Sequence, residues 1–349
     1  MNQPASEPLN PEAAHRKIWG LHHNIFFLGL VSLLTDTSSE MIFTLVPLFV
    51  FNVLGAGAVA VGLIGGLSES MDAIFRIFSG RLSDRIKKRK LLAVLGYGFS
   101  TLVKPFMLLA SGWGAVLAVR FGDRVGKGIR SSPRDALVAD STSVGERGKG
   151  FGVHRAMDTT GAVLGLAIAA VIIYIVQGGG LELSWSSYRW MVTVGVVPAV
   201  LAVLVLIAFV HEKGLPSRST APGPTLPLAA APGFSTRFKL YLVVMAVFTL
   251  GNSSDFFVIL RAQDLGSPVL HITLMLVLLN AGYVACSVPA GIISDRIGRK
   301  RVIALGWLVY ALVYLGFAAA SQVWQIWVLF AGYGIYYGIV EGATRAFVA

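Results

Sequence analysis

Ionisable side chains inside long apolar segments are the residues most able to do chemistry in this sequence. Asp36 and Glu40 fall in the middle of one apolar segment, and Glu69 and Asp72 fall in the middle of the next. A charged side chain at the centre of a bilayer costs about 2.5–3.5 kcal/mol on insertion scales, so each such residue is a functional hypothesis by default. The candidates for substrate or proton binding are Asp36, Glu40, Glu69, Asp72, Arg76, Lys104, Arg124, Asp158, Asn252 and Asp255.

Helical spacing sorts the acidic candidates into groups. Asp36 and Glu40 are four residues apart and share one face of a helix, and two carboxylates this close favour keeping a proton on one of them. Asp72 and Arg76 are also four apart and can pair, which would leave Glu69 free. We therefore consider Asp36, Glu40 or Glu69 as the carrier of a proton. The alternative is that intramembrane acid–base pairs such as Asp72–Arg76 only lock helices together.

A cationic stripe runs along the segment 115–138. Arg120, Arg124 and Lys127 lie three or four residues apart, so on a helix they share a face. The acidic groups at the same depth on neighbouring segments can lie opposite this stripe. The mixed charge suggests a polar or charged small solute, and the stripe equally allows an anion.

Two further candidates lie on other segments. Lys104 falls in one half of the segment 91–112. Asp158 shares a helical stripe with Gly161 and Gly165, whose small size permits close contact with another helix.

The elements that must position these groups are membrane-spanning helices. The chain of 349 residues is 55% hydrophobic and 13% charged, against about 25% charged residues in soluble proteins, and its mean hydropathy is +0.71. Its apolar runs have about the 20 residues needed to cross a bilayer. We expect an all-α membrane protein with ten spans, at about 25–54, 59–80, 91–112, 115–138, 150–177, 188–210, 239–260, 269–291, 301–320 and 324–347.

Basic residues predict the orientation of these spans. They gather in the N-terminal tail and in alternate loops, while most of the opposite loops carry almost no charge. Because cytoplasmic loops are enriched in Lys and Arg, we expect a cytoplasmic N-terminus in a multi-pass protein of the inner or plasma membrane. The net charge of +11 then needs no nucleic-acid partner.

Nothing in the sequence predicts a metal site or a catalytic centre. Cys286 is the only cysteine, which excludes an intramolecular disulfide and a cysteine-based metal cluster. His22 and His23 are adjacent and would point in different directions on a helix. We expect no cofactor and no enzymatic activity.

The chain contains an internal repeat. A glycine followed by Ser-Asp-Arg and a basic cluster occurs at 80–90 and again at 291–301, with Asp84 and Asp295 211 positions apart. The run Thr-Ser-Ser-Glu that ends at Glu40 likewise matches the run Asn-Ser-Ser-Asp that ends at Asp255. We interpret residues 1–211 as a six-helix bundle, 212–238 as a proline-rich cytoplasmic linker and 239–349 as a partial second bundle of four helices.

The repeated loop resembles motif A of the major facilitator superfamily, Gly-x-Leu-Ala-Asp-Arg-x-Gly-Arg-Lys/Arg. The first copy matches at Gly80, Leu82, Asp84 and Arg85, but it has Lys87 where the motif has glycine. The second copy matches at Gly291, Asp295, Arg296, Gly298, Arg299 and Lys300. The resemblance implies a gating role for Gly80, Asp84, Arg85, Gly291, Asp295 and Arg296.

The resemblance also implies a fold and a mechanism. The family has two six-helix bundles, and its members work as secondary transporters by alternating access, so the substrate site should lie between the halves, lined by spans 1, 2, 4, 5, 7, 8 and 10. We expect a monomer in the lipid bilayer that resembles efflux-type members and exports a small molecule, with the proton gradient as its suspected energy source. The alternatives are a facilitator or importer of a charged solute and a membrane receptor that does not transport.

The second half of the repeat has four spans where the first has six. The simplest interpretation is that the last two helices of a twelve-span protein are missing after Ala349. The family's motif A aspartate contacts the eleventh span when the cytoplasmic side closes. We would therefore not expect residues 1–349 alone to transport.

Overall fold

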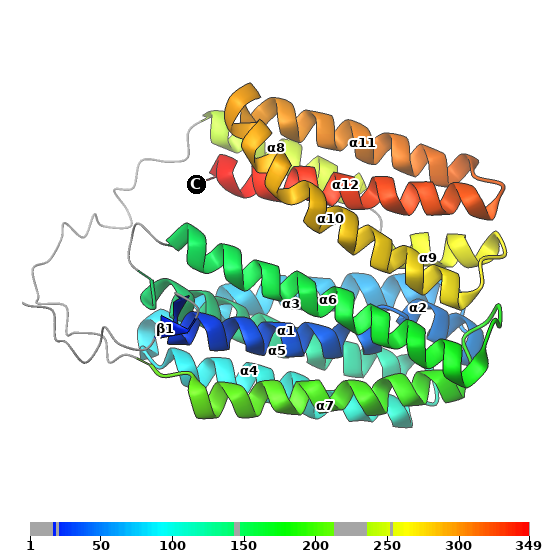
Figure 1. Ribbon diagram of the computed structural model, residues 1–349, viewed down its shortest axis with the longest axis horizontal. Helices are drawn as coiled ribbons and strands as arrows, with labels where there is room; N and C mark the ends of the chain where they lie inside the picture. Colours follow the sequence, from blue (N-terminus) through cyan, green and yellow to red (C-terminus); the bar gives the residue numbers. More distant parts are fainter. Residues whose placement is uncertain (1–16, 19–20, 143–146, 213–235, 252–253, 349) are drawn as a thin grey trace, which may run out of the picture.

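The computed structural model describes residues 17–18, 21–142, 147–212, 236–251 and 254–348. Almost all of these residues are helical, as expected for an all-α membrane protein (Figure 1). The described part also has one hairpin of two short strands, β1 Lys17–Ile18 and β2 Leu21–His22, which pair antiparallel.

The first half of the chain forms the six helical segments that hydropathy predicted. Two of them change their helical type before they end. Span 1 passes through a turn at Thr44–Leu45 into a short helix and a π-helical segment, and span 3 ends in a 3-10 helix. The elements are α1 His23–Phe43, α2 Val46–Leu48, η2 Phe49–Val53, α3 Ala58–Ile86, α4 Arg89–Val103, η3 Lys104–Leu109, α5 Trp113–Asp140, α6 Arg147–Gln177 and α7 Trp185–Phe209.

The second half forms the four remaining segments, one of which consists of two helices. Span 7 is divided between α8 and α9, and the side chain of Ser254 caps the second piece by accepting from the backbone N–H of Phe256. The elements are α8 Thr236–Gly251, α9 Asp255–Asp264, α10 Val269–Ile297, α11 Arg299–Ala319 and α12 Val323–Val348. The linker predicted at 212–238 lies mostly outside the described residues.

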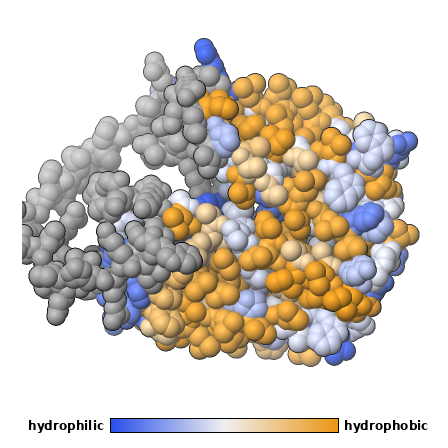
Figure 2. All heavy atoms as spheres, in the orientation of Figure 1, coloured by the Kyte–Doolittle hydropathy of each residue, from blue (hydrophilic) through white to orange (hydrophobic). Residues whose placement is uncertain are grey.

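Eight stretches of the described chain are long and apolar enough to cross a membrane, judged by length and composition. The two expected spans that fall short are α5, which is rich in charged residues, and the divided pair α8 and α9. The outer surface agrees with a lipid environment, because apolar residues dominate it in Figure 2. Large side chains such as Leu102, Leu109, Ile175 and Leu315 point outward.

Close glycine contacts hold the helices of the first half together. α1 packs on α6 and α7, α3 packs on α5, and α4 packs on α5 and α7. A Cβ added at Gly161 would lie 2.3 Å from the carbonyl oxygen of Leu33, and one added at Gly165 would lie 2.4 Å from that of Thr37. The close helix contact predicted for this stripe is therefore confirmed between α6 and α1.

The same glycine contact recurs in the second half and supports the internal repeat. A Cβ at Gly128 on α5 would lie 2.6 Å from Cβ of Phe75 on α3. At the corresponding place a Cβ at Gly338 on α12 would lie 2.8 Å from Cβ of Cys286 on α10. Both residues of the second contact are related to those of the first by the sequence repeat.

The first copy of the repeated motif lies mostly on a helix, which corrects our expectation that the segment forms a loop. α3 continues to Ile86, and the chain turns at Lys87, whose backbone is left-handed with φ of 59°. The turn after α10 uses Gly298, with φ of 95°, at the corresponding position. The residue that permits the turn is therefore the one at which the first copy departs from the motif.

The two halves touch at one end of the molecule and separate toward the other. At the end where α9 lies, the side-chain amide of Gln263 donates to the carbonyl of Leu181 at 3.2 Å, and the N–H of Val269 donates to the carbonyl of Gly180 at 3.4 Å. α6 and α10 lie close together there and diverge toward the end that holds Lys87 (Figure 1). We call these the α9 end and the Lys87 end.

Candidate functional site

A cavity of about 1000 Å³ lies between the two halves. Residues of α1, α3 and α5 form one wall, and residues of α8, α9, α10 and α12 form the other. α6, which we expected among the lining spans, supplies none of the described lining residues. The lining residues are Glu40, Phe43, Thr44, Gly65, Gly66, Glu69, Ser70, Arg120, Arg124, Thr249, Ser254, Asp255, Phe256, Val258, Ile259, Leu276, Leu279, Asn280, Tyr283, Phe330, Tyr333 and Tyr337.

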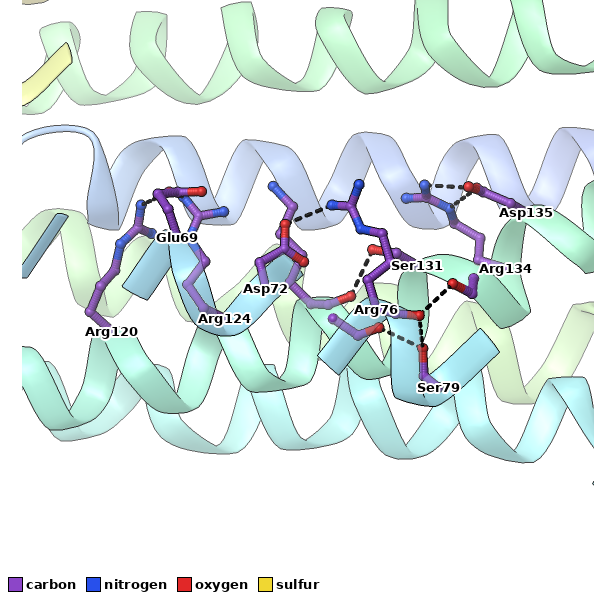
Figure 3. Close-up of polar contacts among 12 residues, drawn as sticks. Glu69, Asp72, Arg76, Ser79, Arg120, Arg124, Ser131, Arg134 and Asp135 are labelled. Atoms are coloured by element: carbon purple, nitrogen blue, oxygen red, sulfur yellow. Dashed lines mark hydrogen bonds and ion pairs between the residues drawn. The ribbon is translucent and has the colours of Figure 1, made fainter. Parts of the chain in front are cut away.

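An ion-pair cluster forms the first wall (Figure 3). Oε1 of Glu69 lies 2.5 Å from an Nη2 of Arg124 and 3.6 Å from that of Arg120. The carboxylate is 58% exposed, while the side chains of Arg120 and Arg124 are only 7% and 12% exposed. Glu69 is therefore not free, contrary to our expectation from spacing along α3. Its partners come from α5, which packs face to face with α3.

The predicted pair of Asp72 and Arg76 is confirmed one turn further along α3. Oδ2 of Asp72 accepts from Arg76 at 2.6 Å (Figure 3). Neither residue is among those that line the cavity. The pair therefore lies outside the cavity wall.

Arg120 links the cavity wall to a buried polar cluster in the first half. Its guanidinium lies over the ring of Phe43, with 4.7 Å to the centroid, and its Nη1 is 3.7 Å from Asp123. Asp123 in turn accepts from the hydroxyl of Ser100 at 2.5 Å. Arg120 is consequently compensated on two sides before any ligand is bound.

Lys104 belongs to the same buried region and does not line the cavity. Its side-chain amine donates to the hydroxyls of Ser38 at 2.8 Å and Ser39 at 3.1 Å. The residue is fully buried between helices. Its contacts hold η3 against α1, which is a structural role.

A carboxylate and two tyrosines form the second wall. Asp255 is the first residue of α9, and its Oδ1 accepts from the hydroxyl of Tyr333 at 2.5 Å. The hydroxyl of Tyr337 lies 3.2 Å from Oδ1 and 3.0 Å from Oδ2. The sequence analysis included Asp255 but missed the tyrosines. Their spacing of four residues on one helical face, between glycines in the middle of span 10, was the available signal.

The two neighbouring acids of span 1 have different surroundings. Glu40 lines the cavity and accepts a hydrogen bond from the hydroxyl of Thr44. Asp36 lies against α6 instead, where its carboxyl group is within hydrogen-bonding reach of Asp158. Although both residues occupy one face of α1, only Glu40 reaches the space between the halves.

Asp158 connects this acidic pair to the second half. Its Oδ1 accepts from Ser32 at 2.6 Å, and its Oδ2 lies 3.4 Å from Nη1 of Arg155. Nε of Arg155 donates to the hydroxyl of Tyr283 on α10 at 3.1 Å. Tyr283 lines the cavity, so a chain of polar contacts runs from α1 through α6 to the cavity wall.

The predicted gating residues lie at the Lys87 end, away from the cavity. Asp84 and Arg85 are exposed on the last turn of α3, and Gly80 lies inside that helix. The remaining candidates are outside what the structure describes, either wholly or as side chains: Asn252, Gly291, Asp295 and Arg296.

Comparison with known proteins agrees with this architecture. The family model described as Major Facilitator Superfamily matches residues 28–349. An uncharacterised MFS-type transporter of Methanocaldococcus jannaschii is 36% identical over 335 residues, which cover 94% of this chain and 80% of the relative. The multidrug resistance protein MdtH of Photorhabdus laumondii is 29% identical over 155 residues, 42% of this chain and 37% of that protein.

The fold is also similar to solved structures. The crystal structure of the nucleoside transporter NupG superposes with a TM-score of 0.68 over 93% of this chain and 82% of that chain, at 13% identity. This likeness concerns the arrangement of helices alone. The family match over nearly the whole sequence and the 36% identity to the relative from Methanocaldococcus jannaschii show that the chain belongs to the major facilitator superfamily of membrane transporters.

Proposed function

We propose that this protein exports a small solute by alternating access, driven by protons. The observation that carries the proposal is the cavity between the halves, whose two walls come from different repeats and bear different polar groups. A site built in this way changes its exposure when one half rocks against the other, because neither half encloses it alone. The cavity is large enough for a solute of drug size.

The relative position of the halves supports a state open at the Lys87 end. The halves meet at the α9 end and diverge toward the Lys87 end (Figure 1). The basic loops predict that the Lys87 end faces the cytoplasm. We therefore assign this arrangement to the inward-open state. In this state Asp84 and Arg85 would contact the opposite half only after the Lys87 end closes.

The acidic pair Asp36–Asp158 is the best supported proton site. A hydrogen bond between two carboxyl groups needs a proton on one of them. Ser32 and Arg155 contact Asp158 directly. The basic groups of Lys127, Arg130 and Arg134 also act on the pair. Glu69 is already engaged by the guanidinium groups of two arginines. Glu40 remains the second candidate, since it faces the cavity with Thr44 as its hydrogen-bond donor.

A proton on this pair can reach the second half through Arg155. Protonation of Asp158 would weaken its attraction for the Arg155 guanidinium and so change the contact of Arg155 with Tyr283. A change at an interface that has two arrangements is the kind of event that couples sites in transporters. This gives proton binding a physical route to the opening of the halves.

The proposed direction of transport is supported by the sequence similarity to MdtH. MdtH carries a name that associates it with multidrug resistance, and it matches 155 residues of this chain. Resistance conferred by a transporter means removal of the compound from the cell. Export is accordingly our proposed direction.

The proposal is tested by flux through the intact protein in proteoliposomes. A panel of radiolabelled amines, carboxylates, sugars and nucleosides is offered in a counterflow assay with and without an imposed pH gradient. We expect counterflow of at least one class, and accumulation that follows the pH gradient. Flux that ignores the gradient would favour a facilitator, and saturable binding without counterflow would favour a receptor.

A further inference from the structure

Building on the proposed transport function, we propose that the cavity is a site for organic cations: amines or quaternary onium groups carried on an apolar or aromatic body. Asp255 with Tyr333 and Tyr337 forms the subsite for the positive group.

The charges that line the cavity leave its acids in excess. The described lining residues include three carboxylates, those of Glu40, Glu69 and Asp255, and two guanidinium groups, those of Arg120 and Arg124. Both arginines are already paired with Glu69, at 3.6 and 2.5 Å. The site therefore offers an incoming ligand more unpaired negative charge than positive charge.

Asp255 is the carboxylate best placed to meet a cation. Among the described side chains, no lysine or arginine lies within 4.0 Å of it, and its hydrogen bonds come from two neutral hydroxyls. The carboxylates of Glu69 and Glu40 line the same cavity and repel it. A ligand cation at this point would relieve repulsion among three acids, whereas an anion would add to it.

Aromatic side chains line the same cavity as Asp255. The rings of Tyr333 and Tyr337 have centroids 5.0 Å apart, and Phe256, Phe330 and Tyr283 also line the cavity. The faces of aromatic rings attract ammonium and guanidinium groups, and cages of such rings recognise quaternary ammonium ligands. The apolar lining residues then receive the body of the ligand.

An anionic substrate fits the same walls less well. It would have to take Arg124 from the 2.5 Å contact with Glu69, and Arg120 from Glu69 and Asp123. Glu69 would then be left in the cavity without a partner. The observed pairing thus favours a cation.

Two probes of matched shape and opposite charge provide the test. We would measure binding of labelled tetraphenylphosphonium, and of tetraphenylborate, to the purified intact protein and to Asp255→Asn, Asp255→Glu and Asp264→Asn. Asp264 is the matched control, because it is exposed at the end of the same helix, pairs with Arg261 and does not line the cavity. Thermal melting shows whether each variant is folded.

We expect saturable binding of tetraphenylphosphonium and at least a tenfold loss of affinity in Asp255→Asn. Asp255→Glu should recover most of that loss, and Asp264→Asn should bind like the wild type. Folded Asp255→Asn with unchanged affinity, or tetraphenylborate bound as tightly as the phosphonium ion, would overturn the proposal. Counterflow of another solute without any phosphonium binding would contradict the cation site while still supporting the transport function.

A measurement on the wild-type protein covers the case in which Asp255→Asn does not fold. A water-soluble carbodiimide with an amine nucleophile modifies accessible carboxylates, and mass spectrometry locates the modified residues. Tetraphenylphosphonium should protect Asp255 and leave Asp264 as reactive as before. Equal labelling of Asp255 with and without the cation would contradict the assignment.

Discussion

Glu40 and Asp255 occupy corresponding positions in the two repeats, and both line the same cavity between the halves. Each lies beside a discontinuity of its span. Glu40 precedes the turn at Thr44 that ends α1, and Asp255 begins α9 after the interruption of span 7. The repeat has therefore placed one acid from each half at a point where regular helix stops, which is where transporters of other folds also bind their ligands.

The ion pair across α3 and α5 should stabilise the first half. Glu69→Gln would leave Arg120 and Arg124 side by side without their shared partner. Loss of one partner of a fully buried pair costs about 3–5 kcal/mol, and the exposure of Glu69 reduces the expected loss to about 1–2 kcal/mol. Thermal unfolding in detergent measures the effect.

Asp135→Asn serves as the control for this variant, because Asp135 pairs with Arg134 near the end of α5 and is exposed. Its melting temperature should stay close to that of the wild type. Equal destabilisation by Glu69→Gln and Asp135→Asn would mean that the ion pairs of Glu69 stabilise the protein no more than an exposed surface pair does.

Contact between α1 and α6 should depend on Gly161. In Gly161→Ala the new methyl group would meet the backbone of Leu33 at 2.3 Å, so the helices must move apart. Overpacking of this kind costs about 1–3 kcal/mol. Gly152→Ala on the same helix meets nothing within 4 Å and should be neutral or stabilising. Similar melting temperatures for the two variants would show that this contact is looser than described.

The left-handed turn at Lys87 predicts a stabilising substitution. A side chain in this conformation costs roughly 1–2 kcal/mol, and glycine avoids that penalty while losing about 0.4–1 kcal/mol through its freer unfolded state. Lys87→Gly should therefore raise the free energy of unfolding slightly, by up to about 1 kcal/mol. Lys88→Gly is the control, because Lys88 has φ of −107° and carries no such strain. A drop in melting temperature for Lys87→Gly larger than that for Lys88→Gly would refute the assignment.

The helical segments and one ion pair could be predicted from the sequence, because each depends only on residues within a single helix. All ten helical segments were predicted because each apolar run indicates its own helix. The pair Asp72–Arg76 was predicted because both residues lie on α3. The partners of Glu69 were not, since spacing along one helix says nothing about which helix packs against it. The interruption of span 7 was also missed, although Ser254 followed by Asp255 is a helix-start signal.

The proposed proton site predicts a separation of binding from coupling. Asp36→Asn removes the shared proton of the Asp36–Asp158 pair without touching the cavity lining. Counterflow of a transported solute should persist, while accumulation against its gradient under an imposed pH gradient should fall at least tenfold. Asp140→Asn, which alters an exposed pair with Arg89, should accumulate solute normally. Coupled accumulation that survives in Asp36→Asn would move the proton site elsewhere, with Glu40 the next residue to test.

The central claim is that protons drive the two halves to open alternately at opposite ends. Distances between spin labels test it most directly, using Lys88→Cys with Lys300→Cys at the Lys87 end and Val59→Cys with Gln322→Cys at the α9 end, in a Cys286→Ser background of the intact protein. Cys286 is the only native cysteine to remove. Double electron–electron resonance between pH 8 and pH 5 should show one distance shortening as the other lengthens. Two distances that stay fixed, or that change in the same direction, would contradict the account.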